Sequence, residues 1–162
     1  MSDKKKAASS QADAPEFITR NRKANHEYEL LDELECGIIL RGSEVKSLRN
    51  HKVSLDEAYA RVVNGELQLI GCDIAEYPQA NVMNHEPKRV RKLLLHKRQI
   101  RKFAEAADQQ GLTLIPLSMY FLKGKVKVVI ALAKGRKLHD KREKLKSNVD
   151  RKEMRIEKLK RN

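Results

Sequence analysis

The sequence predicts a mainly β protein: a small antiparallel barrel of about six strands, with accessory helices and a disordered basic C-terminal tail. Three observations favour this fold. Hydrophobic residues recur with a period of two over residues 28–40, and an Asn-Gly pair at 64–65 separates two apolar runs. In a final run, Val126, Val128, Ile130 and Leu132 fall on one face. Barrels of this size are often of the oligonucleotide-binding type.

Residues 28–40 are expected to form a long strand with one solvated face. Apolar side chains stand at most even positions, and carboxylates such as Glu35 stand at odd ones. Because side chains alternate between the two faces of a strand, the even positions face a core. Asp32 interrupts the apolar positions, so we expect the strand to bend near Asp32 and Glu33. A short helix is expected over 44–49.

The remaining elements follow from local signals. Ser54 and Glu57 have the spacing of a capping box, which predicts a helical turn that includes Tyr59. Asn64-Gly65 supplies the positive φ angles of a type I′ turn and predicts a hairpin whose second strand continues to about Ile74. We further expect a loop over 78–92, a helix over 97–110 that stops at Gly111, and strands over 112–122 and 126–133 with Gly124 between them.

Three segments are expected. Residues 1–15 are polar and aperiodic, which predicts disorder, residues 16–133 are expected to form the barrel domain, and residues 134–162 form a basic tail. The tail holds thirteen Lys and Arg against five acids, in a chain with a net charge of +13. Its apolar stripe is thin, so a helix there is marginal alone in water. We expect the tail to be disordered when free and to fold on a nucleic-acid partner.

Composition restricts the classes of function. No apolar run approaches the roughly 18 residues of a membrane-spanning helix, and the N-terminus lacks the apolar segment of a secretory signal. Two cysteines, Cys36 and Cys72, are too few for a disulfide scaffold and are expected to be core residues. We therefore expect a soluble, cytoplasmic protein whose partner is a polyanion. A tail that only improves solubility is the alternative.

The sequence contains no pattern of a catalytic or metal site. The five histidines have no metal-ligand spacing, and there is no Gly-rich phosphate loop or nucleophile motif. We expect no enzymatic activity, no catalytic residue, no metal and no cofactor. The basic stretch Lys88–Lys92, continued by His96, Lys97 and Arg98, is a candidate phosphate track, with a solvated loop rim as the alternative. Seven Phe and Tyr and no Trp leave few rings for stacking, which favours recognition of folded RNA by shape.

Several strings of the sequence are distinctive when they are taken in order. They are NRKA and HEY within 21–28, ECG at 35–37, GSEVKSLR at 42–49, RKLLLH at 91–96, GLTL at 111–114 and AKGRKLHDKR at 133–142. Their order and spacing closely resemble the SmpB family, whose members partner tmRNA (SsrA RNA) in bacteria. The resemblance runs from about Asn21 to Arg142, and the rest of the tail is similar in character.

The resemblance implies an oligonucleotide-binding-type barrel and a role in trans-translation. Members of the family bind the tRNA-like domain of tmRNA, take the place of its missing anticodon arm, and bring it to a ribosome stalled on an mRNA without a stop codon. The tail becomes helical in the vacated mRNA channel, and the ribosome switches to a template that encodes a degradation tag. The implied partners are tmRNA, small-subunit ribosomal RNA and, through tmRNA, elongation factor Tu. The expected protein is a monomer that binds no membrane.

The resemblance also implies roles for particular residues. The tmRNA-binding surface would contain Asn21, Lys23, Glu35, Leu94, Lys127 and Gly135. His139, supported by Asp140, Lys141 and Arg142, would stack on a decoding-centre base of ribosomal RNA. A carboxylate at Glu35 repels phosphate, but it could accept a hydrogen bond from a base amino group or a 2′-OH. Asn25 and Gln110 depart from the residues common in the family.

Other functions remain open at this point. A ribosomal or tRNA-elbow-binding accessory protein would use the same basic faces without needing His139. A protein of the membrane surface would need a broad apolar helix face, and the stripe of this tail is thin and without rings. A metal-dependent nuclease would need several convergent carboxylates, which the sequence gives no reason to expect.

Overall fold

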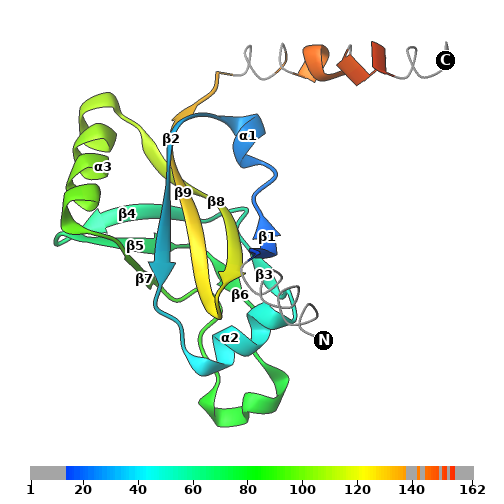
Figure 1. Cartoon of the computed structure of the whole chain (residues 1–162), viewed down its shortest axis with the longest axis vertical. Coiled ribbons are helices and arrows are strands. Elements are labelled where there is room, and N and C mark those ends of the chain that lie inside the picture. The colour runs from blue at the N-terminus through cyan, green and yellow to red at the C-terminus, as the bar shows by residue number, and fades with distance from the viewer. Residues whose placement is uncertain (1–13, 138–141, 143–144, 150, 153, 156–162) are drawn as a thin grey trace, which may run out of the picture.

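The computed structural model describes residues 14–137, 142, 145–149, 151–152 and 154–155 (Figure 1). In chain order its elements are β1 (Glu16–Arg20), α1 (Ala24–Glu27), β2 (Tyr28–Ile38), α2 (Gly42–Arg49), β3 (Val53–Ser54), β4 (Tyr59–Val63), β5 (Glu66–Ile70), β6 (Asp73–Ile74), the 3-10 helix η1 (Pro78–Met83), β7 (Arg91–Leu94), α3 (Lys97–Gln110), β8 (Thr113–Leu122) and β9 (Lys125–Gly135).

Within the described residues, six strands form a closed antiparallel ring. The order around it is β8-β4-β5-β7-β2-β9, and β9 returns to β8. β1 flanks the ring by pairing with β8, and β3 pairs with β6 in a separate two-stranded sheet. The predicted antiparallel barrel of about six strands is therefore confirmed.

The extent of strand pairing differs around the ring. β9 pairs with both β2 and β8 along almost its whole length, whereas β4 meets β8 only through Ala60 and Leu114 in the described sheet. α3 contacts β4 and β9 and lies against the weakly paired side (Figure 1). As a result, β9 is the strand most firmly fixed in the barrel.

The inward faces of the strands form the core. Val128 and Met119 point inward from the neighbouring strands β9 and β8, and both are fully buried. Cys36 and Cys72 belong to the same core, as expected. Burial raises the pKa of the Cys36 thiol to about 12 and that of Cys72 to about 11. Both thiols are therefore protonated at neutral pH and act as small apolar side chains.

The long first strand of the barrel matches its sequence pattern. β2 begins at Tyr28, and its pairing with β9 shifts register between Leu30 and Asp32, close to the expected bend. The short helix expected after it is present as α2, which begins two residues earlier than predicted.

Residues with positive φ angles end the elements where the sequence predicts. Asn64 and Gly65 have φ angles of 51° and 75°, as a type I′ turn requires. The turn between β8 and β9 has the same form, with φ angles of 49° at Lys123 and 72° at Gly124. α3 spans the predicted residues and ends at Gly111, whose φ is 60°.

The helical turn predicted from the capping box at Ser54 is wrong. Ser54 belongs to β3, and its hydroxyl accepts a hydrogen bond from the N–H of Asp56, 3.3 Å away. The N–H of Ala58 then donates to the carbonyl of Leu55 at 3.1 Å, which closes a single turn before β4. Leu55 and Ala58 are both buried, so tertiary packing selects this turn over a helix.

Several elements differ from the sequence expectation. The strand expected to reach Ile74 is divided at Gly71 into β5 and β6, and the loop expected over 78–92 contains η1 and the start of β7. β7 lacks a strand signal because one of its two inward positions is Arg91, which is fully buried. The short elements β1, α1 and β3 also lack a sequence signal.

Replacing Gly71 with alanine is expected to destabilise the barrel by about 2 kcal/mol or more. Gly71 has a φ of +74°, and a Cβ there would lie 2.8 Å from the carbonyl oxygen of Glu57. Gly42→Ala is the matched control, because its Cβ would meet no atom within 4 Å. Chemical denaturation of both variants tests the expectation, and equal free energies of unfolding would contradict it.

The described tail residues, 142, 145–149, 151–152 and 154–155, are helical and exposed. Leu145, Val149 and Met154 are about half exposed or more, so the barrel does not cover them. Residues 1–13, where disorder is expected, and the tail positions 138–141 lie outside the described residues. None of the described helices is long and apolar enough to cross a membrane.

Candidate nucleic-acid interface

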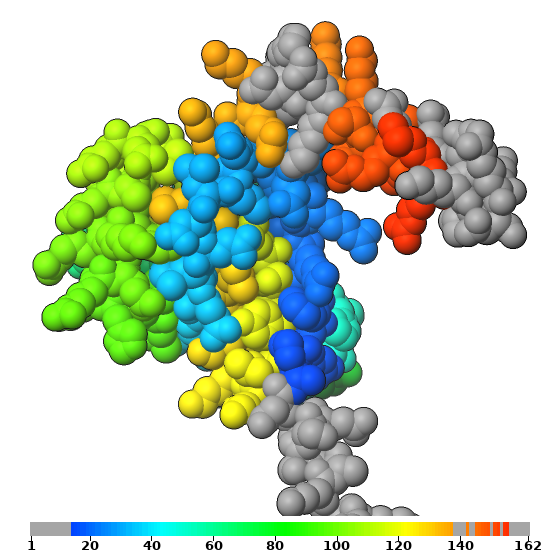
Figure 2. All heavy atoms as spheres, turned by 45° about the horizontal axis from the view of Figure 1, so that its top comes forward, coloured from blue at the N-terminus to red at the C-terminus, as the bar shows by residue number. Residues whose placement is uncertain are grey.

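One outward-facing row of residues crosses five neighbouring strands. Leu94 of β7 pairs with Gly37 of β2, and Gly37 pairs with Lys127 of β9. Lys127 pairs with Tyr120 of β8, which pairs in turn with Phe17 of β1. Figure 2 shows β2 (light blue), β9 (yellow) and β1 (dark blue) on one face of the molecule. Because residues opposite one another on adjacent strands lie about 5 Å apart, the row is continuous. Its ends Leu94 and Phe17 are exposed, and Tyr120 is buried between its neighbours.

Glu35 lies on the same face of β2 as Gly37 and connects two members of the row. Its carboxylate accepts a hydrogen bond from the Tyr120 hydroxyl and forms an ion pair with Lys127 at 3.2 Å. The Tyr120 hydrogen bond is the main cause that holds the pKa of Glu35 below its ordinary value, and Lys127 adds to it against the opposing effect of burial. Burial and the neighbouring carboxylate raise the pKa of Tyr120 to about 12.

The Glu35 carboxylate therefore fixes the positions of a lysine and a tyrosine on this surface. An ionised carboxylate has about four acceptor sites. Tyr120 and Lys127 occupy one oxygen each, so the group still has capacity to accept a hydrogen bond from a ligand hydroxyl or amino group.

A groove of about 450 Å³ lies beside the row, lined by Gly37, Ile38, Leu40, Val45, Leu94, Gly124, Lys125, Val126 and Lys127. Leu94 is half exposed at its rim. A Cβ on Gly37 would lie 3.3 Å from the Cβ of Leu94, so the glycine makes room for this leucine. The groove combines an apolar floor with two lysines, which suits the sugar and phosphate groups of a nucleic acid.

Asn21 and Lys23 lie at the start of α1. Asn21 is buried, and its amide donates hydrogen bonds to the carbonyls of Leu55 and Pro116, both at 3.2 Å. Its side-chain oxygen accepts from the N–H of Ala24 at 3.1 Å. Asn21 therefore anchors α1 to the barrel, while Lys23 is exposed and forms an ion pair with Asp56 at 3.5 Å.

Gly135 ends β9 beside α1. It pairs with Tyr28, and the next residue, Arg136, donates from its N–H to the carbonyl of Glu27 and from Nε to the carbonyl of Tyr28, both at 3.0 Å. A Cβ on Gly135 would meet no atom within 4 Å. The backbone at Gly135 is therefore open to close approach by another molecule.

The structure divides the residues predicted for tmRNA binding into two groups. Glu35, Leu94 and Lys127 lie together, whereas Asn21, Lys23 and Gly135 lie near α1. Lys127 and Gly135 are eight positions apart along β9, or roughly 26 Å. Both groups are connected by the same strand.

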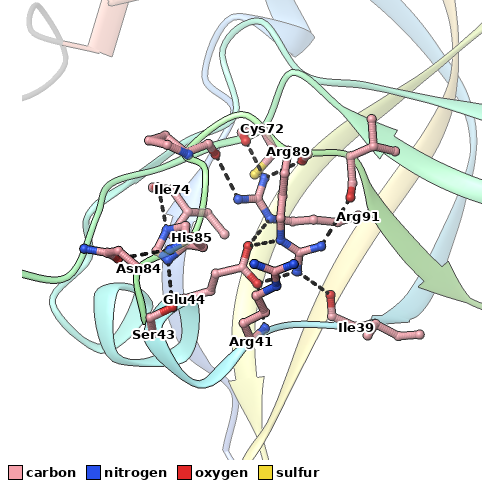
Figure 3. A network of polar contacts seen from close by, with 12 residues as sticks. Ile39, Arg41, Ser43, Glu44, Cys72, Ile74, Asn84, His85, Arg89 and Arg91 are labelled. Carbon is pink, nitrogen blue, oxygen red and sulfur yellow. Dashed lines mark hydrogen bonds and ion pairs between the residues drawn. The ribbon is translucent and has the colours of Figure 1, made fainter. Parts of the chain in front are cut away.

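The phosphate track predicted over Lys88–Lys92 is wrong for its arginines. Arg91 is fully buried and donates from Nε to Glu44 at 2.8 Å, and Arg89 donates to the same carboxylate at 2.5 and 2.7 Å (Figure 3). Lys88 forms an ion pair with Glu57 in the turn before β4, and Lys92 forms one with Glu66 of β5. The charge of this stretch is neutralised mainly within the protein.

Residues 96–98, which continue the basic stretch, form the start of α3. His96 is the N-cap residue, where its side chain and that of Gln99 form a capping box. Lys97 and Arg98 are exposed on the first turn of the helix. They lie outside the row described above.

Of the residues predicted to contact the ribosome, Arg142 is the one that the structure describes, and it is helical and exposed. His139, Asp140 and Lys141 lie outside the described residues.

Three residues of the outward face are missed by sequence reasoning: Phe17, Arg20 and Tyr120. The guanidinium carbon of Arg20 lies 3.9 Å from the centre of the Phe17 ring, and the Phe17 and Tyr120 ring centres are 5.5 Å apart. β1 is five residues long, too short for its alternation to be a signal, so the side on which Phe17 lies could not be foreseen.

In the part of the chain that the structure describes, no group of three or more His, Cys, Asp or Glu side chains is placed to hold a metal ion. Two carboxylates of β2 form ion pairs with cations of the protein, Asp32 with Lys102 and Glu35 with Lys127.

Comparison with known proteins gives consistent matches. The model of the SmpB protein family matches residues 18–160. An SsrA-binding protein of Rhodopirellula baltica is 57% identical over 130 residues, which cover 80% of this chain and 74% of the relative. An SsrA-binding protein of Protochlamydia amoebophila is 50% identical over 137 residues, which cover 85% of this chain and 90% of the relative.

The fold has a similar counterpart among solved structures. A chain from "tmRNA-SmpB: a journey to the center of the bacterial ribosome" superposes with a TM-score of 0.63 and 46% sequence identity. The match covers 74% of this chain and 85% of that one.

Proposed function

The chain belongs to the SmpB protein family, and on that premise we propose that it binds tmRNA and acts with it on the ribosome in trans-translation. The family match over residues 18–160 carries the proposal. The row that joins Leu94, Lys127 and Glu35 on one face of the barrel supports it, because it offers a cation and an apolar surface together. The family consists of RNA-binding proteins and not of enzymes.

In this proposal the barrel binds the tRNA-like domain of tmRNA. Lys127 neutralises a backbone phosphate, and Leu94 packs against a sugar or a base at the rim of the groove. Glu35 holds Lys127 in position and accepts a hydrogen bond from a 2′-OH or a base amino group. Shape recognition of this kind needs few base contacts.

The second group of residues extends the same surface toward the tail. Lys23 contributes a cation, and Gly135 allows the RNA backbone to approach β9 closely, since no Cβ is present there. Asn21 acts indirectly, because its amide is engaged with three backbone groups that hold α1 in place.

The tail completes the proposed function on the small ribosomal subunit. His139 stacks on a decoding-centre base, and Asp140, Lys141 and Arg142 support it, while the following helix enters the mRNA channel when that channel is empty. The thirteen basic residues of segment 134–162 favour this contact with ribosomal RNA. The protein acts as a monomer, and elongation factor Tu is brought into the complex through tmRNA.

Binding to the tRNA-like domain of tmRNA, compared with ordinary tRNA over a salt series, tests the proposal. We expect tight binding that persists for the tRNA-like domain at physiological salt while binding of tRNA falls steeply. Equal affinities with equal salt slopes would mean counterion release alone and would contradict the proposal.

Lys127→Met is expected in the same assay to weaken binding several-fold and to reduce the salt slope by about one. Lys102→Met is the matched control, because Lys102 is an exposed lysine of α3 in an ion pair with Asp32 and lies away from the row. Equal losses in the two variants would show that Lys127 has no special role.

A further inference from the structure

The row of the candidate interface extends past the residues that the proposed function gives a role in tmRNA binding. It ends on β1 at Phe17, which is 42% exposed although it is a large apolar ring. Phe17 packs against Tyr120 with ring centres 5.5 Å apart, and Tyr120 donates a hydrogen bond to Glu35. A continuous set of contacts therefore joins Lys127, through Glu35 and Tyr120, to an exposed ring at the edge of the sheet.

Arg20 covers part of this ring. Its guanidinium carbon lies 3.9 Å from the centre of the Phe17 ring, which is a close cation–π contact. Arg20 is exposed, and among the described residues it forms no ion pair. Its planar group and its charge are thus presented to solvent on the same face as Lys127.

We propose that Phe17 and Arg20 form a stacking platform for an unpaired nucleotide of RNA, at the β1 end of the tmRNA-binding row. This inference rests on the proposed function and adds a contact to it. An unpaired base stacks on the aromatic ring or on the guanidinium plane, and the N–H groups of Arg20 reach the adjoining phosphate.

The chemistry of the two residues favours an unpaired nucleotide over a paired one. Bases in an A-form helix are stacked on each other and hidden from side chains, whereas loop nucleotides expose their flat faces. Aromatic and arginine side chains are the groups on which such bases stack. Lys125 and Lys127, which lie on β9 two strands from Phe17, supply charge for an adjoining phosphate.

The position of the platform agrees with this ligand. Tyr120 lies opposite Lys127 on the next strand, and Phe17 lies opposite Tyr120 on the strand after that. Lys127 and Phe17 are therefore two strand separations apart, or about 10 Å. A single RNA loop can therefore contact the lysine and the ring together.

The test uses substitutions that separate the contributions of the Phe17 ring, the planar guanidinium of Arg20 and the charge of Arg20. Phe17→Leu removes the ring but keeps an apolar side chain against Tyr120. Arg20→Lys keeps the charge and removes the plane, and Arg20→Gln removes both. Arg101→Gln is the control, because Arg101 is exposed on α3. Affinity for the tRNA-like domain of tmRNA is measured by fluorescence anisotropy across a salt series, with the melting temperature of each full-length variant recorded.

We expect Phe17→Leu and Arg20→Lys each to lose about ten-fold in affinity, the loss of one stacked base. The salt slope should stay unchanged for Arg20→Lys and decrease for Arg20→Gln. Arg101→Gln should bind as the wild type does, and all melting temperatures should stay close to that of the wild type, since Arg20 is exposed.

Three outcomes would overturn the inference. Wild-type affinity in Phe17→Leu would show that the ring does not contact the RNA. Wild-type affinity in Arg20→Lys would show that Arg20 contributes only its charge. An equal loss in Arg101→Gln would show that the effect is not specific to Phe17 and Arg20. In each case the wild-type protein would still prefer the tRNA-like domain over tRNA, so the proposed function would stand. Loss of that preference in the wild type would instead contradict the proposed function itself.

Discussion

Replacing Glu44 with alanine is expected to lower the free energy of unfolding by about 3–5 kcal/mol. Glu44 and Arg91 are both fully buried, and the carboxylate is the only negatively charged partner that Arg91 has among the described residues. Removing it leaves a guanidinium charge in the barrel without compensation. Denaturant unfolding followed by circular dichroism measures the loss.

The surface pair of Glu66 and Lys92 provides the control. Both side chains are nearly half exposed, and β7 carries this lysine directly after Arg91. Glu66→Ala should therefore cost less than about 1 kcal/mol. Similar losses for Glu44→Ala and Glu66→Ala would show that the buried network contributes no more than a surface ion pair.

The pH dependence of stability gives a second measure of the same network. Burial alone would raise the pKa of Glu44, but hydrogen bonds from Arg89, from the N–H of Arg41 and from Arg91 outweigh it and hold the pKa below its ordinary value. The stabilisation is therefore fully present above the unfolded-state pKa of about 4.3 and is lost as the pH falls through the lower folded-state pKa. The difference in stability between wild type and Glu44→Gln should shrink over that acidic range.

Truncating the chain after Lys137 is expected to abolish tagging of stalled peptides while binding to the tRNA-like domain of tmRNA persists at physiological salt. The last barrel strand ends with Gly135, and the N–H of Arg136 still donates to the carbonyl of Glu27 in α1. The exposed apolar residues Leu145 and Val149 contribute nothing to the core. The salt slope of RNA binding should decrease, because much of the positive charge is removed.

His139→Ala is the companion variant, since it leaves the net charge at neutral pH and the length of the tail unchanged. It should reduce tagging strongly and leave the melting temperature and tmRNA affinity as they are. Loss of tmRNA binding in the truncated protein would contradict the division of roles between barrel and tail. A large fall in the melting temperature of His139→Ala would show that the tail packs on the barrel.

The sequence predicts the elements whose determinants are local. The alternation in β2, the Asn64-Gly65 turn and the stop of α3 at Gly111 each depend on residues within a few positions of one another. β7 could not be predicted from local residues. Arg91 can occupy an inward position because its guanidinium pairs with the carboxylate of Glu44, which lies 47 residues earlier in the chain. The residues from Ser54 to Glu57 fit both a capping box and a tight turn, and the burial of Leu55 selects the turn.

The candidate site shows the same limit. The family resemblance indicates Glu35 and Lys127 separately, but their contact depends on the register between β2 and β9. Tyr120 joins them from β8 and carries no sequence signal of its own. Phe17 and Arg20 become part of the surface only once β1 pairs with β8.

The double pairing of β9 has a mechanical consequence. Its hydrogen bonds to β2 and β8 run perpendicular to the strand, so a pull on the chain beyond Gly135 loads many of them in shear at the same time. Such a strand resists extension far better than one that opens pair by pair. Tension applied at Arg136 would thus be shared between β2 and β8 along the whole stretch of β9 as far as Lys127.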